Sequence, residues 1–149
     1  MTIDEEKKKQ LGVALPAWAV KPHPTKTNMS AIHPMAVIDR LNEVFGICGW
    51  SFFTEYISCD MRFQKTKNGG RTVYDSAVKG TLKIGDITIE QFGGSTNDDK
   101  GDALKGGGTD ALTKIASYLG IGAEIYKGHG NVDGGAPPEV KPPTAPVRR

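Results

Sequence analysis

The chain lacks any long hydrophobic run. It has 149 residues, 38% of them apolar, and no eighteen apolar residues stand together, so the sequence predicts no membrane span. Residues 1–10 are charged and contain no apolar stretch of the kind that a secretory signal needs. We therefore expect a single cytoplasmic domain that has no membrane partner.

Cysteine and histidine are also scarce. Cys48 and Cys59 have neither metal-ligand spacing nor the density of a disulfide scaffold. His23, His33 and His129 fall in different segments, and no Ser-His-Asp or Cys-His arrangement joins neighbouring predicted elements. The sequence thus predicts no metal, no cofactor and no catalytic apparatus, and we expect a protein that is not an enzyme.

Net charge is small, at +2, but it is unevenly distributed. Residues 60–83 hold six basic and two acidic side chains, whereas residues 84–104 hold one basic and five acidic side chains. Two neighbouring segments of opposite sign favour either a polyanion-binding site or a subunit interface.

Hydrophobic periodicity predicts an α+β fold with a β-β-β-α core. A curved antiparallel meander packs on a helix and is preceded by a short helix. The expected elements are a helix at 34–45, a strand at 50–63, its hairpin partner up to residue 84, a strand at 87–92, a helix at 101–119 and a short extended piece at 124–127.

Composition divides the chain into three parts. Residues 1–29 form an N-terminal arm and connector, in which Pro16, Pro22 and Pro24 favour extended backbone. Residues 30–127 form the core domain. Residues 128–149 contain five prolines and four glycines but no Leu, Ile, Phe or Trp, which is typical of a disordered tail.

Asn68-Gly69 is the strongest hairpin signal in the chain, because a type I′ turn needs positive φ at both central residues. A two-residue loop at this point fixes the register of the flanking strands. The expected apolar pairs on one face are Phe63 with Tyr74, Cys59 with Val78, and Phe53 with Ile84.

The opposite face of that hairpin combines charge with aromatic surface. Arg62 is expected beside Asp75, and Lys79 and Lys83 are expected beside Tyr56. Cations that follow a phosphate backbone, next to rings on which bases stack, are typical of proteins that bind single strands without sequence preference. The alternative is a solvated strand face protected by charge.

A glycine-rich stretch spans residues 93–108. It has neither the Gly-Lys-Ser/Thr of a P-loop nor Rossmann spacing, so close packing of a helix on a sheet is the simpler interpretation and nucleotide binding the alternative. Asp98, Asp99 and Asp102 form either a cation cluster or the acidic first turn that a helix dipole favours.

Two segments carry a family resemblance. Residues 37–46 (VIDRLNEVFG), followed by Gly49-Trp50, resemble the opening of the Rad52 annealing core. Residues 99–106 (DKGDALKG) and 109–114 (TDALTK) are similar to the second signature of the same family. The ending at 119–122 (LGIG) resembles the bacterial and phage branch, which includes the DdrA and Sak proteins.

The resemblance implies a ring that anneals DNA without ATP and a groove between the hairpin and the helical part. On the groove floor the family carries basic residues, of which this chain keeps Lys114, with Thr113 and Ser117 at the flanking positions. Lys114 could instead form a salt bridge with Asp110. The candidate DNA-binding residues are Arg62, Lys65, Lys67, Arg71, Lys79, Lys83, Lys100, Lys105, Lys114 and Tyr56.

The sequence therefore predicts a protein that binds single-stranded DNA and anneals complementary strands during recombination and repair. Its expected partners are single-stranded DNA, further copies of itself in a ring, and a single-strand-binding protein, in the cytoplasm of a bacterial cell. Two alternatives remain: a nucleotide-dependent enzyme that uses the glycine-rich stretch, and a structural oligomer in which the oppositely charged segments pair between subunits.

Overall fold

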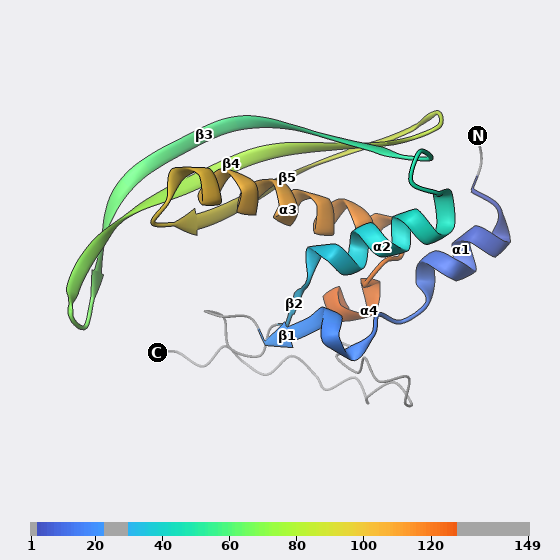
Figure 1. Cartoon of the computed structure of the whole chain (residues 1–149), viewed down its shortest axis with the longest axis horizontal. Helices are drawn as coiled ribbons and strands as arrows, with labels where there is room; N and C mark the ends of the chain where they lie inside the picture. Colours follow the sequence, from blue (N-terminus) through green and yellow to red (C-terminus); the bar gives the residue numbers. More distant parts are fainter. Residues whose placement is uncertain (1–2, 23–29, 128–149) are drawn as a thin grey trace.

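A computed structural model describes residues 3–22 and 30–127. Its largest layer is an antiparallel sheet of three strands in the order β3-β4-β5, arched over the long helix α3 (Figure 1). The bounds are Ser51–Thr66 for β3, Gly69–Ile84 for β4, Ile87–Asn97 for β5 and Lys100–Tyr118 for α3. This arrangement confirms the expected α+β meander packed on a helix.

The glycine-rich stretch serves the contact between α3 and the concave face of the sheet. A Cβ atom on Gly93 would lie 2.2 Å from the carbonyl oxygen of Gly107. A Cβ atom on Gly107 would lie 2.7 Å from both Ser76 Oγ and Val78 Cγ2. Close helix–sheet packing therefore accounts for these glycines, because any larger side chain would hold α3 away from β4 and β5.

Helix α2 (Pro34–Phe45) begins where the sequence predicts it. Pro34 occupies the first turn, and the Nδ1 atom of His33 accepts a hydrogen bond from the Met35 amide at 3.2 Å. The helix buries Val37, Leu41 and Val44 and ends at Gly46, whose φ of 80° favours glycine.

The N-terminal segment belongs to the same hydrophobic core. It contains helix α1 (Glu5–Gly12), the 3₁₀ turn η1 (Ala17–Ala19) and strand β1 (Val20–Pro22), which pairs with β2 (Ser30–Ile32). Its buried members are Leu11, Leu15 and Ala19, at 1%, 1% and 0% exposure. The arm expected at residues 1–29 therefore packs into the domain where it is described.

The C-terminal end of the described chain is helical. The sequence predicts an extended piece at 124–127, and this is wrong, because helix α4 spans Ala123–Tyr126. Glu124 Oε1 accepts a hydrogen bond from the Leu15 amide at 3.2 Å, which joins α4 to the N-terminal segment. The prediction of a disordered tail at 128–149 lies outside the described residues.

The predicted hairpin register is wrong. Thr66 pairs with Gly69, so the two-residue loop is Lys67-Asn68 and not Asn68-Gly69. A β-bulge at Ile57 then shifts the register once more. Phe63 faces Thr72 in place of Tyr74, Cys59 faces Ser76 in place of Val78, and Phe53 faces Thr81 in place of Ile84.

The bulge reverses which side chains of β3 share a face. Tyr56 pairs with Val78, which is 2% exposed on the concave face, against α3. Lys79 and Lys83 alternate with Val78 and lie on the convex face. The sequence-based expectation that Tyr56 accompanies these two lysines is therefore wrong.

Within the described ranges, none of the helices is long and apolar enough to cross a membrane. Over the same residues no three His, Cys, Asp or Glu side chains come together as a metal site. Asp99 is the N-cap of α3, and its Oδ1 atom accepts from the Asp102 amide at 2.9 Å. Helix capping thus explains this part of the acidic cluster.

Candidate nucleic-acid interface

Strand β3 is an edge strand that buries none of its sixteen residues. On its concave face Tyr56, Met61 and Phe63 are 66%, 67% and 63% exposed. We call these three side chains the concave row. The Phe63 ring lies across the hairpin, since its Cζ atom would be 2.3 Å from a Cβ atom on Gly70. Three exposed apolar side chains in one row on an edge strand favour a binding role.

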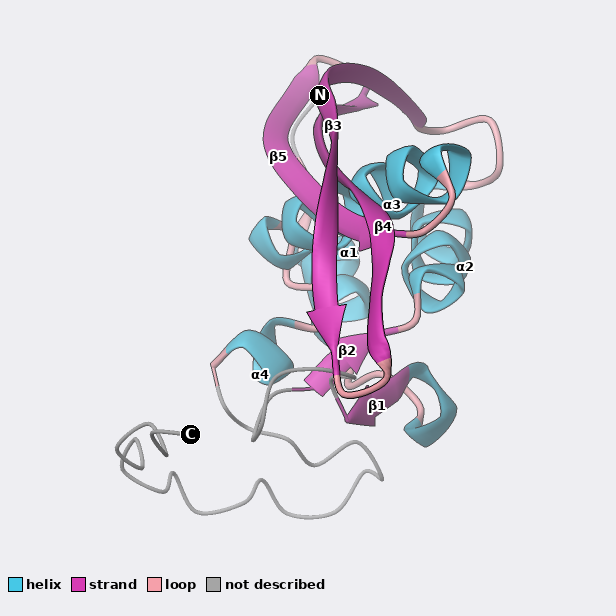
Figure 2. Cartoon of the chain, turned by 90° about the vertical axis from the view of Figure 1, so that its left-hand side faces the viewer, coloured by secondary structure: helices cyan, strands magenta, loops and turns pink. Residues whose placement is uncertain are grey.

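Five candidate cations have no carboxylate partner among the described residues: Lys83, which lies over the Phe53 ring, and four that lie near the hairpin loop and the start of α3. Lys65 follows Phe63 on the concave face, and Lys67 lies in the hairpin loop. Lys100 and Lys105 are exposed in the first two turns of α3. We call these four the free lysines. The hairpin bends past the N-terminal end of α3 (Figures 1 and 2), so all four belong to one end of the molecule.

On the convex face, in contrast, Lys79 and Arg62 are both paired with carboxylates. Lys79 Nζ lies 3.2 Å from Glu90 Oε2, and the Arg62 guanidinium donates to both carboxylate oxygens of Asp75. The hydrogen bond from Arg62 lowers the pKa of Asp75, and Thr96 lowers it further by donating to the same carboxylate. Paired in this way, Arg62 and Lys79 offer little net charge to a polyanion.

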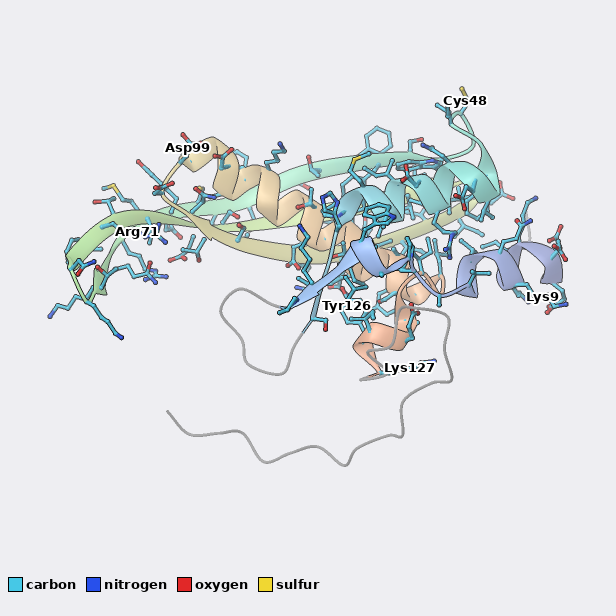
Figure 3. All side chains as sticks on the ribbon, turned by 60° about the horizontal axis from the view of Figure 1, so that its bottom comes forward. Lys9, Cys48, Arg71, Asp99, Tyr126 and Lys127 are labelled. Carbon is cyan, nitrogen blue, oxygen red and sulfur yellow. The ribbon has the colours of Figure 1, made fainter. Side chains whose placement is uncertain are left out.

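Arg71 and Lys83 complete the sequence-predicted hairpin set. Arg71 Nη1 lies 4.0 Å from Asp98 Oδ2, which joins the hairpin to the loop before α3. Figure 3 shows Arg71 on the hairpin and Asp99, the N-cap of α3, toward the same end of the molecule. Lys83 lies at the other end of β4, with its ammonium 5.5 Å from the centre of the Phe53 ring. A depression of about 400 Å³ lies there, lined by Phe53, Thr81, Lys83, Thr88 and Glu90.

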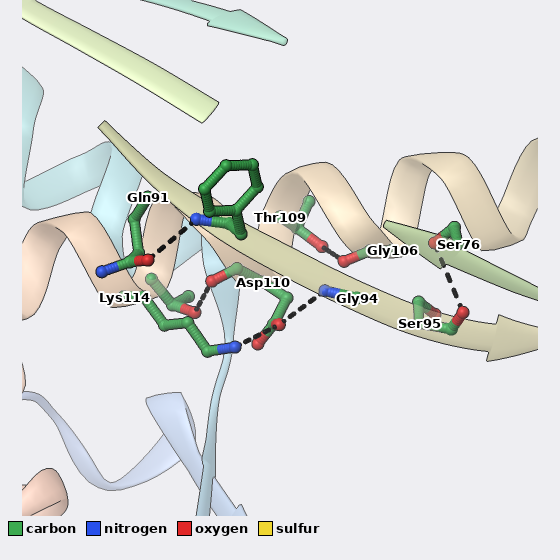
Figure 4. A network of polar contacts seen from close by, with 10 residues as sticks. Ser76, Gln91, Gly94, Ser95, Gly106, Thr109, Asp110 and Lys114 are labelled. Carbon is green, nitrogen blue, oxygen red and sulfur yellow. Dashed lines mark hydrogen bonds and ion pairs between the residues drawn. The ribbon is translucent and has the colours of Figure 1, made fainter. Parts of the chain in front are cut away.

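Lys114 forms the salt bridge that its spacing allows. Its Nζ atom lies 2.8 Å from Asp110 Oδ2, which also accepts from the Gly94 amide at 2.9 Å (Figure 4). Thr113 Oγ1 donates to the Asp110 carbonyl at 2.9 Å, and Ser117 Oγ donates to the Lys114 carbonyl at 2.6 Å. The two residues that flank Lys114 are thus turned back onto the helix.

The structure therefore divides the ten predicted site residues into groups. Tyr56 and the free lysines lie on the concave side or at the hairpin end, whereas Arg62, Lys79 and Lys83 lie on the convex face. The last two, Arg71 and Lys114, are paired with Asp98 and Asp110. Sequence reasoning missed Met61 and Phe63 as site residues, because it placed Phe63 in an apolar pair with Tyr74 on the face opposite the lysines. Nothing in the local sequence separates an exposed apolar row from a buried one.

Comparison with known proteins identifies the family. No curated protein sequence matches the chain at a significant level. The family model described as Rad52/22 family double-strand break repair protein matches residues 5–133, a range that includes the N-terminal segment, the sheet, α3 and α4. Because this match covers most of the chain, the protein belongs to the Rad52/22 family of double-strand break repair proteins.

Proposed function

We propose that this protein binds single-stranded DNA and anneals complementary strands as a homo-oligomer, without nucleotide hydrolysis. The family implies a role in DNA double-strand break repair and annealing. The observation that carries the finer proposal is the concave row, which lies in line with Lys65 and beside the start of α3, where Lys100 and Lys105 have no carboxylate partner among the described residues.

The lysines and the aromatic rings have different roles in the proposed interface. The free lysines hold phosphates, which supplies affinity without reading sequence. Tyr56 and Phe63 offer rings on which bases stack, a contact that every base accepts. Sixteen residues at about 3.3 Å each make β3 about 50 Å long, enough for an extended strand of several nucleotides.

The remaining candidate cations contribute less to phosphate binding, because most of them must first give up an ion pair. Arg62, Lys79 and Lys114 each leave a carboxylate before they meet a phosphate, whereas Lys83 lies over Phe53 on the convex face. We propose that they add to a secondary contact, together with Arg71, and that the free lysines dominate.

The homo-oligomer is proposed from the edge position of β3. A strand whose outer edge is unpaired is a template for association, and head-to-tail contacts that close on themselves make rings. The purely structural alternative loses support, because the oppositely charged segments already meet within one chain at Lys79–Glu90 and Arg71–Asp98. The nucleotide alternative loses support because Gly107 is used for helix–sheet packing.

Fluorescence anisotropy with labelled oligo(dT), at two salt concentrations, tests the proposal. Lys65→Ala with Lys105→Ala should weaken binding about tenfold or more and flatten its dependence on salt. The matched pair Lys79→Ala with Lys83→Ala also removes two charges, and it should weaken binding less. A larger loss in the second pair would place the interface on the convex face, and equal losses would contradict the dominance of the free lysines. A parent protein without affinity for oligo(dT) would disprove DNA binding itself.

Annealing is measured separately, by energy transfer between two labelled complementary strands. The protein should accelerate pairing in the absence of ATP, and added ATP should change nothing. Mass photometry of the same sample should show a discrete species larger than one chain. Dependence of annealing on ATP would favour the nucleotide-using alternative.

Finer features of the family assignment remain proposals. The LGIG ending at 119–122 supports the bacterial and phage branch, and this in turn supports a cytoplasmic site of action. A single-strand-binding protein is the expected partner, because it would occupy the substrate before annealing begins. Co-purification from a bacterial lysate before and after nuclease treatment would separate a direct contact from one made through DNA.

A further inference from the structure

We infer that Asp110 is a positioning residue that holds the Lys114 ammonium away from phosphate and thereby sets the DNA affinity of this side of α3. The inference rests on the proposed function. Its basis is that Lys114 has one carboxylate partner, 2.8 Å away, and that this carboxylate is itself anchored by a second contact.

The second contact fixes where Asp110 stays. Asp110 Oδ2 accepts from the Gly94 amide at 2.9 Å, on strand β5. That amide lies on β5, which is the other edge strand of the sheet, and donates to a helix side chain. The Phe92 amide, two residues earlier on the same edge, is likewise bonded to a side chain, Gln91 Oε1 at 2.9 Å. Asp110 is therefore part of the seam between α3 and β5, whether or not Lys114 is present.

Lys114 is less firmly held than Asp110. Its side chain is 44% exposed, and an exposed pair four residues apart on a helix is weak. A phosphate can therefore compete for the ammonium. The Asp110 carboxylate would remain at the edge of β5 and would repel that phosphate. The affinity of this site for DNA is therefore lower than an unpaired lysine would give.

The described side chains that lie closest along this side of α3 are uncharged. Thr113 and Ser117 flank Lys114 and donate to helix carbonyls, and Gln91 Nε2 donates to Tyr118 Oη at 2.8 Å. The local charge of the pair is zero while Asp110 is ionised. A substitution that removes the charge of Asp110 but keeps the shape of its side chain should therefore free the Lys114 ammonium for phosphate.

Asp110→Asn makes this change. The amide oxygen of Asn can still accept from the Gly94 amide, whereas the salt bridge is lost. Affinity for labelled oligo(dT) at low salt should rise about three- to tenfold, as expected when one like charge is removed a few ångströms from a phosphate near the surface. The slope of log affinity against log salt should steepen by about 0.7, the value for one additional phosphate contact to a single strand.

Asp39→Asn is the matched control. Asp39 is exposed on α2, has no polar partner among the described residues, and gives the same change in net charge. It should leave both the affinity and the slope within about twofold of the parent, since screening removes distant charges. A gain equal to that of Asp110→Asn would overturn the inference, because general charge would then explain it.

A double variant separates the inference from the proposed function. In a Lys114→Ala background, Asp110→Asn should no longer add a phosphate contact. The double variant should therefore bind oligo(dT) about as tightly as the parent does. An unchanged gain would disprove the role of Lys114. Asp110→Ser provides the same release if the Asn variant melts early. Absence of oligo(dT) binding in the parent and in every variant would overturn the proposed function and this inference together.

Discussion

Arg40 Nη1 lies 2.6 Å from the carbonyl oxygen of Val13, and the same atom lies 3.1 Å and 3.2 Å from the carbonyls of Gln10 and Leu11. Arg40 is 8% exposed, although it belongs to helix α2. The last carbonyls of α1 are thus satisfied by a cation from another helix, where the helix dipole favours positive charge. Arg40 thus adds polar contacts between the N-terminal segment and α2 to the apolar packing of Leu11 and Leu15.

Arg40→Met should destabilise the protein by about 2–4 kcal/mol, because it leaves the buried Leu11 carbonyl and the part-buried Val13 carbonyl without the guanidinium donor. Urea unfolding followed by Trp fluorescence measures the loss. Glu43→Gln is the control: Glu43 is 70% exposed and 3.5 Å from the guanidinium, so its loss should cost less than about 1 kcal/mol. A similar cost for both variants would mean that the ion pair, and not the carbonyl contacts, holds Arg40.

Gly107→Ala should destabilise the protein by about 1–3 kcal/mol despite the better helix propensity of Ala. The added methyl meets Ser76 Oγ and Val78 Cγ2 at 2.7 Å, which overpacks the seam between α3 and the sheet. Gly12→Ala is the matched control, since nothing lies within 4 Å of its Cβ position, and it should stabilise by about 0.4–1 kcal/mol. Thermal melting of both proteins provides the comparison, and a more stable Gly107→Ala protein would contradict the packing argument.

The helices were predictable because their signals are local. Pro34 at the start, Gly46 at the end and the apolar spacing between them place α2 at the bounds that the structure has. For α3, periodicity and the glycines after it give bounds within one residue of Lys100–Tyr118. The short α4 was missed because four residues are too few for a periodic pattern to develop.

The faces of β3 were not predictable, because apolar residues stand in both phases of the strand. Phe52 and Phe53 are neighbours, as are Tyr56 and Ile57, so alternation alone cannot choose a face. The bulge at Ile57 then exchanges, partway along the strand, the side chains that point to each face. For this reason the candidate site in the structure is built on the concave row and not on the convex lysines.

The Arg62–Asp75 pair gives a pH prediction. Hydrogen bonding to Arg62, and then to Thr96, lowers the pKa of Asp75, so its titration midpoint should lie below the ordinary value of about 3.9. A depressed carboxyl pKa stabilises the fold above the unfolded pKa, and that stabilisation disappears as pH falls through the depressed value. Carbon NMR of the Asp75 carboxyl measures the midpoint.

Arg62→Met should return that midpoint most of the way to the ordinary value, whereas Thr96→Val should move it less, in the order of the two causes. The pair is exposed on the convex face, so salt should also weaken the effect. An unchanged midpoint in Arg62→Met would show that the guanidinium does not hold Asp75 in solution.

The hairpin register makes a prediction that separates the structure from the sequence pattern. Met61 pairs directly with Tyr74, whereas a loop at Asn68-Gly69 would pair Phe63 with Tyr74. Directly opposed residues have Cα atoms about 4.5–5.5 Å apart, which suits a disulfide, whereas Cβ atoms two residues out of register lie about 7–8 Å apart. In a Cys48→Ser, Cys59→Ser background, Met61→Cys with Tyr74→Cys should therefore oxidise within one chain, and Phe63→Cys with Tyr74→Cys should not. Thiol titration after mild oxidation, with dimers separated by gel mobility, distinguishes the two. The opposite result would restore the register set by Asn68-Gly69 and would move Met61 and Phe63 relative to β4.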